Sequence, residues 1–554
     1  MNTEKKIRVA VLTRGKSLEA WEVVALEKVK ALPFVEIVLQ VRDCSGQTNI
    51  GNTKKKSLFA RFFSYNWSRL FWNRWFRKYG NVPATKETPV NGIFDNVLAI
   101  EVVPELRGKF SQHFPASDIE KIKSKQPDVI LRFGFNILRG DILTVAPHGV
   151  WSYHHADHEI IRGGPAGFWE YMRGEHHTGA ILQRLTEKLD DGIILRRGYW
   201  ALVKHSFREN LDSLLMNSSG WIANALIEIH HHGMVRPQSP AVSSKAKVYK
   251  YPGNFRMIMF WNVLLGNKIA FHWNNLFSPE TWQIGIVNQT LESVMSNGIT
   301  GEIEWHSAPE SDSYYADPFS IVNSDNTRTY ICEYFSGKDQ RSRILIPAST
   351  VCYNPGTHVS FPGIYSLEGV QYILPESSAS GKCELVEFGS LEPTIILNEP
   401  IVDPVLINHD NLWWLFGHKA DDQNNAALFI YYSDSPKGEF HPHALNPVKT
   451  DIRNSRSAGE IFRFENKLIR PAQDSAVTYG KAIVMNEIVT LTPTSFEERP
   501  IKRIEADPVW EYDKGIHTIN AHGDKTLIDA KSFRFNFANF RAQFSRKARR
   551  ITGK

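Results

Sequence analysis

The chain has 554 residues and a formal net charge of +6, with 42% hydrophobic and 22% charged residues. This composition is typical of globular proteins and excludes a fibrous or fully disordered chain, while the length predicts two or three domains. No run of eighteen apolar residues occurs, so we expect no membrane-spanning helix. The four cysteines lack the CxxC spacing of zinc sites and indicate reduced thiols.

The N-terminal half alternates predicted strands and helices. Mostly apolar segments at 7–12 and 35–41 predict two strands, and Ser17 is expected to cap a helix over 18–32 that ends before Pro33. Later strands are predicted at 127–133, 149–153 and 178–185, and helices at 168–173 and 210–230. This order predicts an α/β domain with a Rossmann-like parallel sheet over residues 1–235. The chain enters its first strand without a signal-peptide pattern, which favours a cytoplasmic location.

The C-terminal half has a different pattern. Residues 236–280 predict a Pro- and Ser-containing linker and an amphipathic docking helix at 255–273. From residue 281, short alternating strands predominate, and the unit Ala316-Asp317-Pro318 returns as Val402-Asp403-Pro404. Related units occur at 358–362 and 458–462. Units of about 40–50 residues predict an all-β five-bladed propeller over 281–540, followed by a basic tail at 541–554.

Four short motifs lie in order within the predicted α/β domain. His154 stands at the carboxyl end of a strand, and the chain continues with Arg162-Gly163-Gly-Pro165, Gly174-Glu-His-His-Thr-Gly179 and Asp190-Asp191-Gly192. Their order and spacing resemble the formyltransferase family, which includes methionyl-tRNA, phosphoribosylglycinamide and sugar-nucleotide N-formyltransferases. The resemblance covers residues 5–235.

The resemblance implies transfer of a formyl group from 10-formyltetrahydrofolate to an amine, without a metal. His154 would assist proton transfer, and Asp190 would orient His154 and raise its pKa. Because ligands of open α/β sheets bind beyond the carboxyl ends of strands, a pocket wall is expected there. The cofactor-binding residues would be Phe133, Gly134, Phe135, Asn136, Asp191 and Gly192, and Arg162 and Gly163 would bind substrate.

Ser152 departs from the family pattern, which has an asparagine at this position. A serine hydroxyl can donate one hydrogen bond to an oxyanion, but it reaches less far. Losing a comparable donor costs about 10²–10³ in rate. The domain is therefore a working variant, a slow enzyme, or a domain that kept the fold and lost the reaction. The retained His154 and Asp190 favour activity.

A basic aromatic insert interrupts the α/β domain at about residues 50–85. Residues 54–78 hold eight Lys or Arg and no acid, and the tail at 541–554 holds six cations and no acid. Without these fourteen cations, the formal net charge of the remaining chain is −8. The insert suits an anionic membrane surface, which would place the protein on the cytoplasmic face of a membrane. RNA or an anionic glycan would also fit, although nucleic acid is the less favoured partner. In the structural alternative, its aromatics pack on their own domain or on the propeller.

The second half resembles the N-terminal domain of plant glucosamine inositolphosphorylceramide transferase. More distantly, it resembles five-bladed arabinanase and xylosidase glycoside hydrolases, which place three carboxylates around the propeller axis. The resemblance covers about residues 280–535 and implies a sugar-binding funnel. Its residues would be Asp317, Asp403, Glu460, Arg456, Arg470 and Gln473. Hydrolysis by these carboxylates, sugar binding without catalysis and a purely structural role for the Asp-Pro units are the three alternatives, and we favour the second.

The two halves together predict an N-formyltransferase that acts on an amino sugar in surface polysaccharide or glycolipid biosynthesis. The acceptor would be a sugar nucleotide, a lipid-linked sugar or a glycan. The alternative is a carbohydrate-binding or glycoside-processing propeller protein with a catalytically impaired formyltransferase domain. Formylation of an aminoacyl-tRNA is disfavoured because the small C-terminal barrel of that family is not recognisable.

Overall fold

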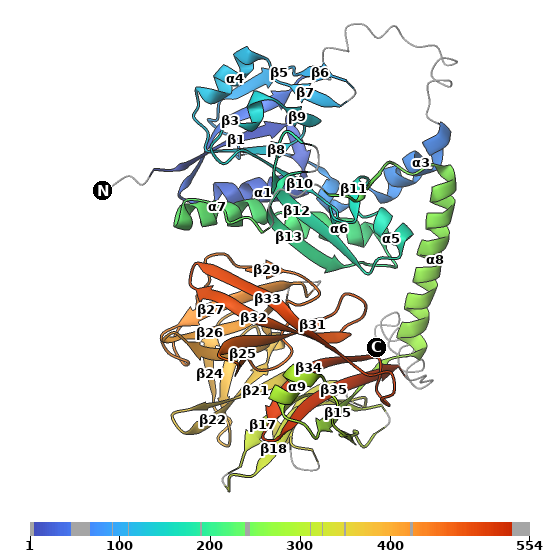
Figure 1. The fold of residues 1–554 in the computed structure, drawn as a ribbon, viewed down its shortest axis with the longest axis vertical. Helices are drawn as coiled ribbons and strands as arrows, with labels where there is room; N and C mark the ends of the chain where they lie inside the picture. The colour runs from blue at the N-terminus through green and yellow to red at the C-terminus, as the bar shows by residue number, and fades with distance from the viewer. Residues whose placement is uncertain are drawn as a thin grey trace. The chain divides into compact units, whose positions relative to one another are not determined.

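The computed structural model describes residues 5–45, 67–90, 92–108, 110–188, 191–238, 244–310, 312–323, 325–338, 340–347, 351–420 and 425–533. The chain divides into two compact units, Met1–Lys268 and Ile269–Lys554 (Figure 1). The division falls inside the segment 236–280, for which the sequence predicts a linker and a docking helix. No helix in the described ranges is long and apolar enough to span a membrane.

A seven-stranded sheet organises the first unit, in the order β13-β12-β10-β8-β1-β3-β5 (Figure 1). The strands from β5 to β10 run parallel, whereas β12 and β13 form an antiparallel edge. The parallel sheet predicted from the sequence is therefore present. Its strands are β1 (Ile7–Thr13), β3 (Val35–Asp43), β5 (Ala99–Val102), β8 (Val129–Phe133), β10 (Val150–His154), β12 (His177–Arg184) and β13 (Ile193–Ala201).

Helices cover both faces of this sheet (Figure 1). Helices α1 (Ala20–Lys30) and α7 (Trp221–His232) pack against each other on one face. On the other face, α4 (Ala116–Lys123) shares a core cluster with Ala10 and Leu12 of β1. Because successive strand residues point to opposite faces, a strand covered on both sides must be apolar throughout. The continuous apolar run at 9–12 reflects this requirement.

The start of α1 differs from the prediction. Ser17 does not cap the helix, because it belongs to the short strand β2 (Ser17–Glu19), which pairs with β4 (Glu87–Pro89). Glu19 is the N-cap residue instead, and its backbone N–H donates to the Glu22 carboxylate at 2.8 Å. A carboxylate in the first turn also interacts favourably with the helix dipole.

The single helix predicted at 210–230 is two helices. Helix α6 (Phe207–Ser218) has Ser206 as its N-cap, and α7 begins after Gly220. The apolar periodicity continues through the break, which is why the sequence pattern did not reveal it. The remaining elements of this unit include α3 (Leu70–Tyr79), α5 (Trp169–Arg173), β6 (Glu105–Arg107), β7 (Ser111–His113), β9 (Ile137–Arg139), β11 (Ile161–Gly163), β14 (Lys247–Tyr249) and the start of α8 (Asn254–Phe277).

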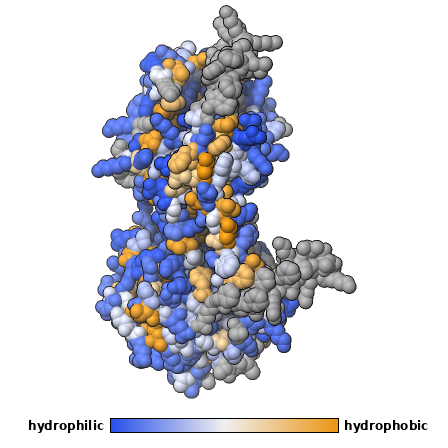
Figure 2. Space-filling model, turned by 90° about the vertical axis from the view of Figure 1, so that its right-hand side faces the viewer, coloured by the Kyte–Doolittle hydropathy of each residue, from blue (hydrophilic) through white to orange (hydrophobic). Residues whose placement is uncertain are grey.

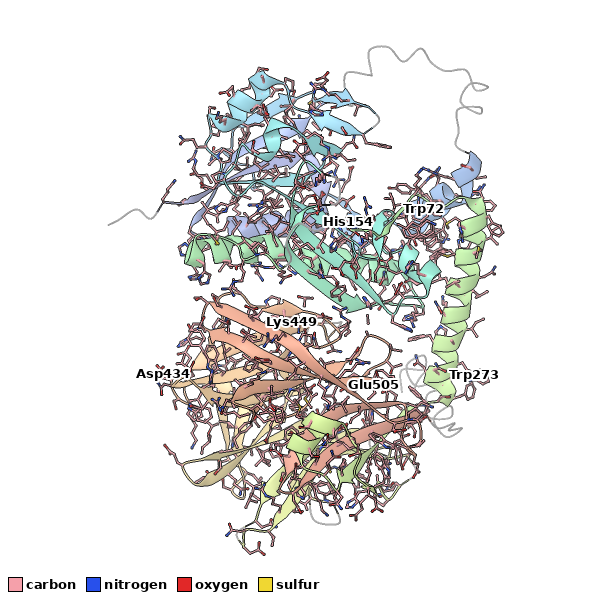
Figure 3. All side chains as sticks on the ribbon, in the orientation of Figure 1. Trp72, His154, Trp273, Asp434, Lys449 and Glu505 are labelled. Carbon is pink, nitrogen blue, oxygen red and sulfur yellow. The ribbon has the colours of Figure 1, made fainter. Side chains whose placement is uncertain are left out.

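The described part of the basic aromatic insert packs on its own unit. In α3, the Trp72 side chain is 3% exposed and lies 5.4 Å from the Phe168 ring, and the Trp75 ring lies 5.2 Å from Phe260 (Figure 3). For this helix the structural alternative is confirmed. Residues 54–66 of the insert and the basic tail at 541–554 lie outside the described residues.

The second unit consists of consecutive antiparallel sheets, and five are present in its described part (Figure 1). Four of them follow chain order: β17–β20, β21–β24, β25–β29 and β30–β33. The fifth joins the two ends of the unit, because β15 of the hairpin β15–β16 pairs with β35 of the hairpin β34–β35. The short helix α9 (Leu291–Asn297) connects β15 to β16.

The strand bounds of the second unit are β15 (Glu280–Val287), β16 (Ile303–His306), β17 (Tyr314–Val322), β18 (Arg328–Ser336), β19 (Arg341–Leu345), β20 (Val351–Tyr353), β21 (Ser360–Leu367), β22 (Val370–Glu376), β23 (Cys383–Glu387), β24 (Pro393–Leu397), β25 (Ile401–His409), β26 (Leu412–Lys419), β27 (Ala427–Ser433), β28 (His441–Pro442), β29 (Lys449–Thr450), β30 (Phe462–Phe464), β31 (Lys467–Asp474), β32 (Ala482–Thr492), β33 (Ser495–Glu505), β34 (Gly515–His522) and β35 (Lys525–Phe533). The short strands that the sequence predicts from residue 281 onward are therefore present.

The recurring Asp-Pro unit forms a bulge in the first strand of its sheet. The pairing register shifts at this point in β17, β21 and β25. Asp317, Phe361 and Asp403 each precede a proline there and have φ values of 50°, 45° and 47°. Strand β34 shows the same kind of shift around His517 and Thr518. The sequence repeat thus marks a local backbone shape that several sheets share.

Candidate functional site

His154 lies where the sequence predicts it, at the carboxyl end of β10 (Figure 3). Its side chain is partly buried, and Nε2 lies 3.3 Å from the carbonyl oxygen of Ile161. The neighbouring His155 is partly buried against Trp21 and contacts the Ser218 hydroxyl. Burial lowers the pKa of His155 to about 3, so this second imidazole is neutral and structural. Asp190, the predicted partner of His154, lies outside the described residues.

Ser152 is buried, and both hydrogen-bonding functions of its hydroxyl are occupied. Its Oγ accepts a hydrogen bond from Arg132 Nη1 at 2.8 Å and donates to the carbonyl oxygen of Tyr153 at 3.4 Å. A serine hydroxyl has a single hydrogen to donate. Ser152 therefore offers no donor to an oxyanion without giving up its contact with the backbone.

Arg132 is the residue that sequence reasoning missed at this site. Its guanidinium also donates to the carbonyl oxygens of Phe135 and Asn136, at 2.7 and 3.0 Å. Burial, together with the nearby Arg14, lowers the pKa of Arg132 to about 10. The sequence signal for this role was a lone arginine within an otherwise apolar strand. A buried guanidinium group needs several hydrogen-bond acceptors, so such an arginine indicates a polar site.

The predicted cofactor wall is a tight turn after β8. Phe133 is buried, and a Cβ on Gly134 (φ 155°) would lie 2.8 Å from the Arg14 backbone nitrogen. Phe135 packs against Phe114, and the Asn136 backbone N–H donates to Gln112 Oε1 at 2.5 Å. The turn therefore brings the carboxyl ends of β1 and β8 close together.

Asp191 and Gly192 lie immediately before β13 rather than in this turn. The Asp191 carboxylate is 4.0 Å from Lys188 Nζ, and a Cβ on Gly192 would lie 2.2 Å from Gln183 Oε1. 10-Formyltetrahydrofolate stays a prediction.

A cavity of about 260 Å³ lies beside the carboxyl ends of β1, β3 and β5. Its lining combines cations with two acids and a thiol: Arg14, Lys16, Arg42, Asp43, Glu101 and Cys44. Open α/β sheets place their ligands at this edge. None of the predicted site residues lines this cavity.

Arg162 and Gly163 fix the edge of the first unit by pairing β11 with β14. Arg162 Nη1 donates to the carbonyl oxygen of Ser244 at 3.1 Å. Gly163 has a φ of 84°, and a Cβ at this position would lie 2.2 Å from the carbonyl oxygen of Tyr249. The glycine is therefore required by close approach of two backbones.

Replacing Gly163 by alanine should lower the free energy of unfolding by about 2 kcal/mol, because the left-handed φ and the backbone clash both oppose the change. Gly164→Ala is the matched control, since nothing lies within 4 Å of a Cβ there and its φ is not positive. Chemical denaturation of both variants provides the measurement. Equal stabilities for the two variants would contradict the assigned close approach.

In the second unit, the bulges bring together a polar cluster: Asp317, Asp403, Arg456, Gln473, His517 and Asp529. Arg456 Nε donates to Asp403 Oδ2 at 2.5 Å, and Gln473 Nε2 donates to the same oxygen at 3.2 Å. His517 Nδ1 lies 2.7 Å from Asp529, and its Nε2 lies 3.4 Å from Asp317. We refer to these six residues as the bulge cluster.

Burial and pairing shift the ionisation of the bulge cluster. Burial alone would raise the pKa of Asp403, but Arg456 outweighs it and holds that pKa below its usual range. Burial lowers the pKa of His517, whereas Asp529 and Asp317 raise it more strongly, to about 9. Burial raises the pKa of Asp317. At neutral pH, His517 is therefore an imidazolium between two carboxyl groups.

The donor atoms of Asp317, His517 and Asp529 lie within 4.8 Å of one another, as metal ligands would. Both ring nitrogens of His517 face carboxylates, so a protonated ring fits the group. A metal bound to one ring nitrogen of His517 would displace the proton there and break the ion pair that this nitrogen makes. The donor set thus fits an ion-paired triad better than a metal site.

Glu460 and Arg470 do not join the bulge cluster. The Glu460 backbone N–H donates to Asn520 Oδ1. Burial raises the pKa of the Glu460 carboxyl group to about 7, although the charge of Arg328 opposes this shift. The Arg470 side chain is 1% exposed and pairs with Glu498 at 2.6 Å. The prediction that Arg470 lines a sugar funnel is therefore wrong, because its guanidinium is fully used in a buried ion pair.

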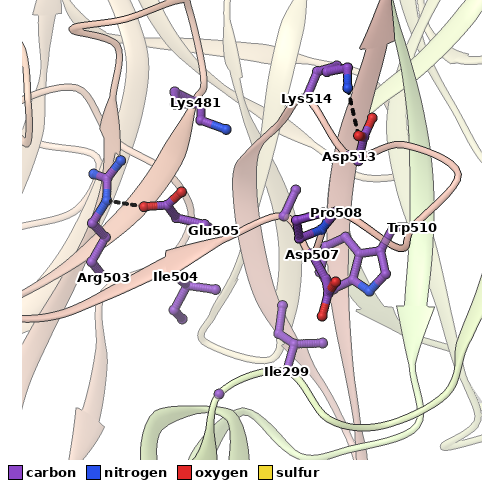
Figure 4. Close-up of a pocket in the computed structure, with 12 residues that line it drawn as sticks. Ile299, Lys481, Arg503, Ile504, Glu505, Asp507, Pro508, Trp510, Asp513 and Lys514 are labelled. Atoms are coloured by element: carbon purple, nitrogen blue, oxygen red, sulfur yellow. Dashed lines mark hydrogen bonds and ion pairs between the residues drawn. The ribbon is translucent and has the colours of Figure 1, made fainter.

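A cavity of about 620 Å³ opens elsewhere on the second unit (Figure 4). Arg503 Nε donates to Glu505 at 2.7 Å and Lys514 Nζ to Asp513 at 2.6 Å, and the partly exposed Trp510 stands beside them. The sequence does not predict this cavity, because the charged residues around Trp510 have no regular spacing that would indicate a binding site.

Residues 348–530 match the family model described as glucosamine inositolphosphorylceramide transferase 1, N-terminal. The protein of that name from Oryza sativa subsp. japonica is 30% identical over 207 residues, covering 34% of this chain and 28% of the relative. The one from Arabidopsis thaliana is 34% identical over 207 residues, covering 33% and 27%. The predicted resemblance of the second half to this transferase is confirmed. The chain spans less than a third of the length of these curated relatives.

The similarity of this chain to solved structures is more distant. Phosphoribosylglycinamide formyltransferase from Anaplasma phagocytophilum is 14% identical, covering 44% of this chain and all of that one, with a TM-score of 0.27. An α-L-arabinofuranosidase from Clostridium thermocellum is 10% identical, covering 34% of this chain and 74% of that one, with a TM-score of 0.24.

The predicted enzyme class, formyltransferase, is wrong. The curated relatives are named for a transferase of glucosamine inositolphosphorylceramide and not for formyl transfer. The first unit offers a physical reason. The position expected to supply an oxyanion donor holds Ser152, whose hydroxyl is bound to Arg132 and to the backbone.

Proposed function

We propose that this protein acts in glycan or glycolipid assembly and that its second unit recognises an amino sugar at the bulge cluster. The relatives carry glucosamine in their name, and the matched segment 348–530 includes Asp403, Arg456, Gln473 and His517. The observation that carries the proposal is the set of buried, oriented carboxylates and cations at one place in the second unit. Binding sites combine a few such polar groups with aromatic walls.

The five sheets support this site as blades of a five-bladed propeller. Strand β17 packs against β34 and β21, β21 packs against β25, and β31 packs against β34. Gln473 of β31 bonds Asp403 of β25, which connects the remaining pair. The bulged first strands would then surround a common axis, with the fifth sheet closing the ring through strands from both ends of the unit.

The charge of the bulge cluster favours an amine. Three carboxyl groups, those of Asp317, Asp403 and Asp529, face the cations His517 and Arg456. One further carboxyl group, that of Glu376, is close enough to interact with Asp403. Burial and the charge of Asp403 raise the pKa of Glu376 to about 7. A sugar ammonium group would compensate this excess of acid, while the sugar hydroxyls would bond the fixed donors.

Two side chains give access to the cluster. His358 is exposed. Its pKa is lowered by partial desolvation, and the nearby charge of Asp403 opposes this shift. Tyr479 is partly exposed, and the Arg456 guanidinium lies 4.9 Å from the centre of its ring. Asp403 itself is 2% exposed. A sugar would therefore meet the aromatic and imidazole rings first, with Arg456 below them.

The test is a comparison of glucosamine, N-acetylglucosamine and glucose by saturation-transfer NMR on the full chain. Glucosamine should bind best, and Tyr479→Ala should weaken its binding at least tenfold, whereas Tyr479→Phe should retain it. His441→Ala is the control, because His441 is exposed and lies outside the cluster.

Two outcomes would overturn the proposal. One is loss of sugar binding in Trp510→Ala together with full binding in Tyr479→Ala, which would assign recognition to the cavity of Figure 4. The other is the absence of binding of all three sugars to a protein whose thermal unfolding shows that it is folded.

A further inference from the structure

Helix α8 carries two apolar faces. Met257 and Phe260 form the inner face and are fully buried, and the Trp261 ring lies 5.5 Å from Phe71 of the aromatic insert. The Asn254 side chain accepts a hydrogen bond from the Phe71 backbone N–H at 3.0 Å. This inner face attaches the start of the helix to the first unit.

The outer face of α8 is apolar and exposed. Phe255 is 73% exposed, Leu265 58%, Ile269 61% and Trp273 56%, with Ile258 and Met259 also exposed. At 100° per residue, these six positions fall within a sector of about 120°. Figure 2 looks onto this side of the molecule, and hydrophobic side chains run along the helix. Such a stripe is larger than the scattered apolar residues of ordinary surfaces.

Cations flank the apolar stripe. On the same helical projection, Arg256 and Lys268 stand beside opposite edges of the sector, and the 24 residues of α8 include no acid. The adjoining helix α3 adds Arg74, Arg77 and Lys78, again with no acid among its ten residues. An apolar stripe between basic margins is the pattern of helices that lie in the surface of an anionic membrane.

We propose that α8 lies in the surface of an anionic lipid bilayer, with Phe255, Ile258, Leu265, Ile269 and Trp273 among the acyl chains. Arg256 and Lys268 then reach the lipid phosphates. A second copy of the chain is the less suitable occupant, because pairing two such faces would bring cations of like sign together. The helix docks on the surface and does not cross, in agreement with the finding that no helix of the described residues is long and apolar enough to span a membrane.

Flotation of the full chain with lipid vesicles tests the proposal. The protein should float with vesicles of phosphatidylcholine and phosphatidylserine, less with phosphatidylcholine alone, and less at high salt. The double variant Leu265→Glu, Ile269→Glu should bind at least tenfold more weakly, since two apolar side chains lose their place in the bilayer. Val509→Glu is the control, because Val509 is 86% exposed and lies outside α8.

Equal flotation of the double variant and the control would overturn the proposal. So would a wild-type protein that ignores both vesicles and forms a dimer by light scattering, if the double variant is monomeric. That result would assign the stripe to a second copy. Thermal unfolding of each variant verifies that the fold persists.

Discussion

Replacing Glu498 by glutamine is expected to lower the free energy of unfolding by about 3–5 kcal/mol. The Glu498 side chain is 1% exposed and pairs with Arg470 at 2.6 Å and with Lys449 at 2.8 Å. Burial would raise the pKa of Glu498, but these two cations outweigh it and lower the pKa to about 2. Glutamine removes the negative charge and leaves two cations in a buried place without compensation.

Glu497→Gln is the matched control for this prediction. Glu497 is the exposed neighbour, so the same substitution there should change stability by less than about 0.5 kcal/mol. Urea denaturation followed by tryptophan fluorescence measures both variants. If Glu498→Gln proves as stable as Glu497→Gln, the buried ion pair does not stabilise the second unit.

The second large effect is a loss of stability between pH 6.5 and 9, caused by His517. Because Asp529 and Asp317 outweigh burial and raise its pKa to about 9, the folded protein holds a proton that the unfolded chain releases near pH 6.5. The stabilisation is complete below pH 6.5 and is lost as the pH rises to 9. A shift of this size corresponds to about 3 kcal/mol.

The pH dependence of His517→Asn isolates this contribution. The variant should be less stable at pH 6, since asparagine leaves Asp529 and Asp317 without a cation, and its stability should fall less between pH 6.5 and 9. His441→Asn should keep the wild-type slope, because His441 is exposed. A wild-type slope in His517→Asn would show that another group titrates in this range.

Much of the fold follows from the sequence because its periodicities are local. The apolar run at 9–12 indicates a strand buried on both faces, and the repeated Asp-Pro units mark the bulges of β17 and β25. The break between α6 and α7 could not be predicted from the apolar periodicity. Ser219 and Gly220 interrupt the helix while the apolar residues on either side keep their spacing.

The candidate site was less predictable than the fold, because the type of a residue does not reveal which group it will bond or pair with. Arg456 and Arg470 look alike in the sequence, yet one bonds Asp403 in the bulge cluster and the other bonds Glu498. Ser152 was recognised as a departure, but only the structure shows that Arg132 occupies its hydroxyl. Partners more than a few residues away along the chain are set by the fold and not by the local pattern.

A crystal structure with glucosamine bound tests the recognition of an amino sugar most directly. We expect the sugar to contact Tyr479 and His358, with its hydroxyls within hydrogen-bonding distance of Arg456 and its amine toward the carboxylates of the bulge cluster. A sugar bound only in the cavity beside Trp510, with the bulge cluster unchanged, would contradict the proposed site.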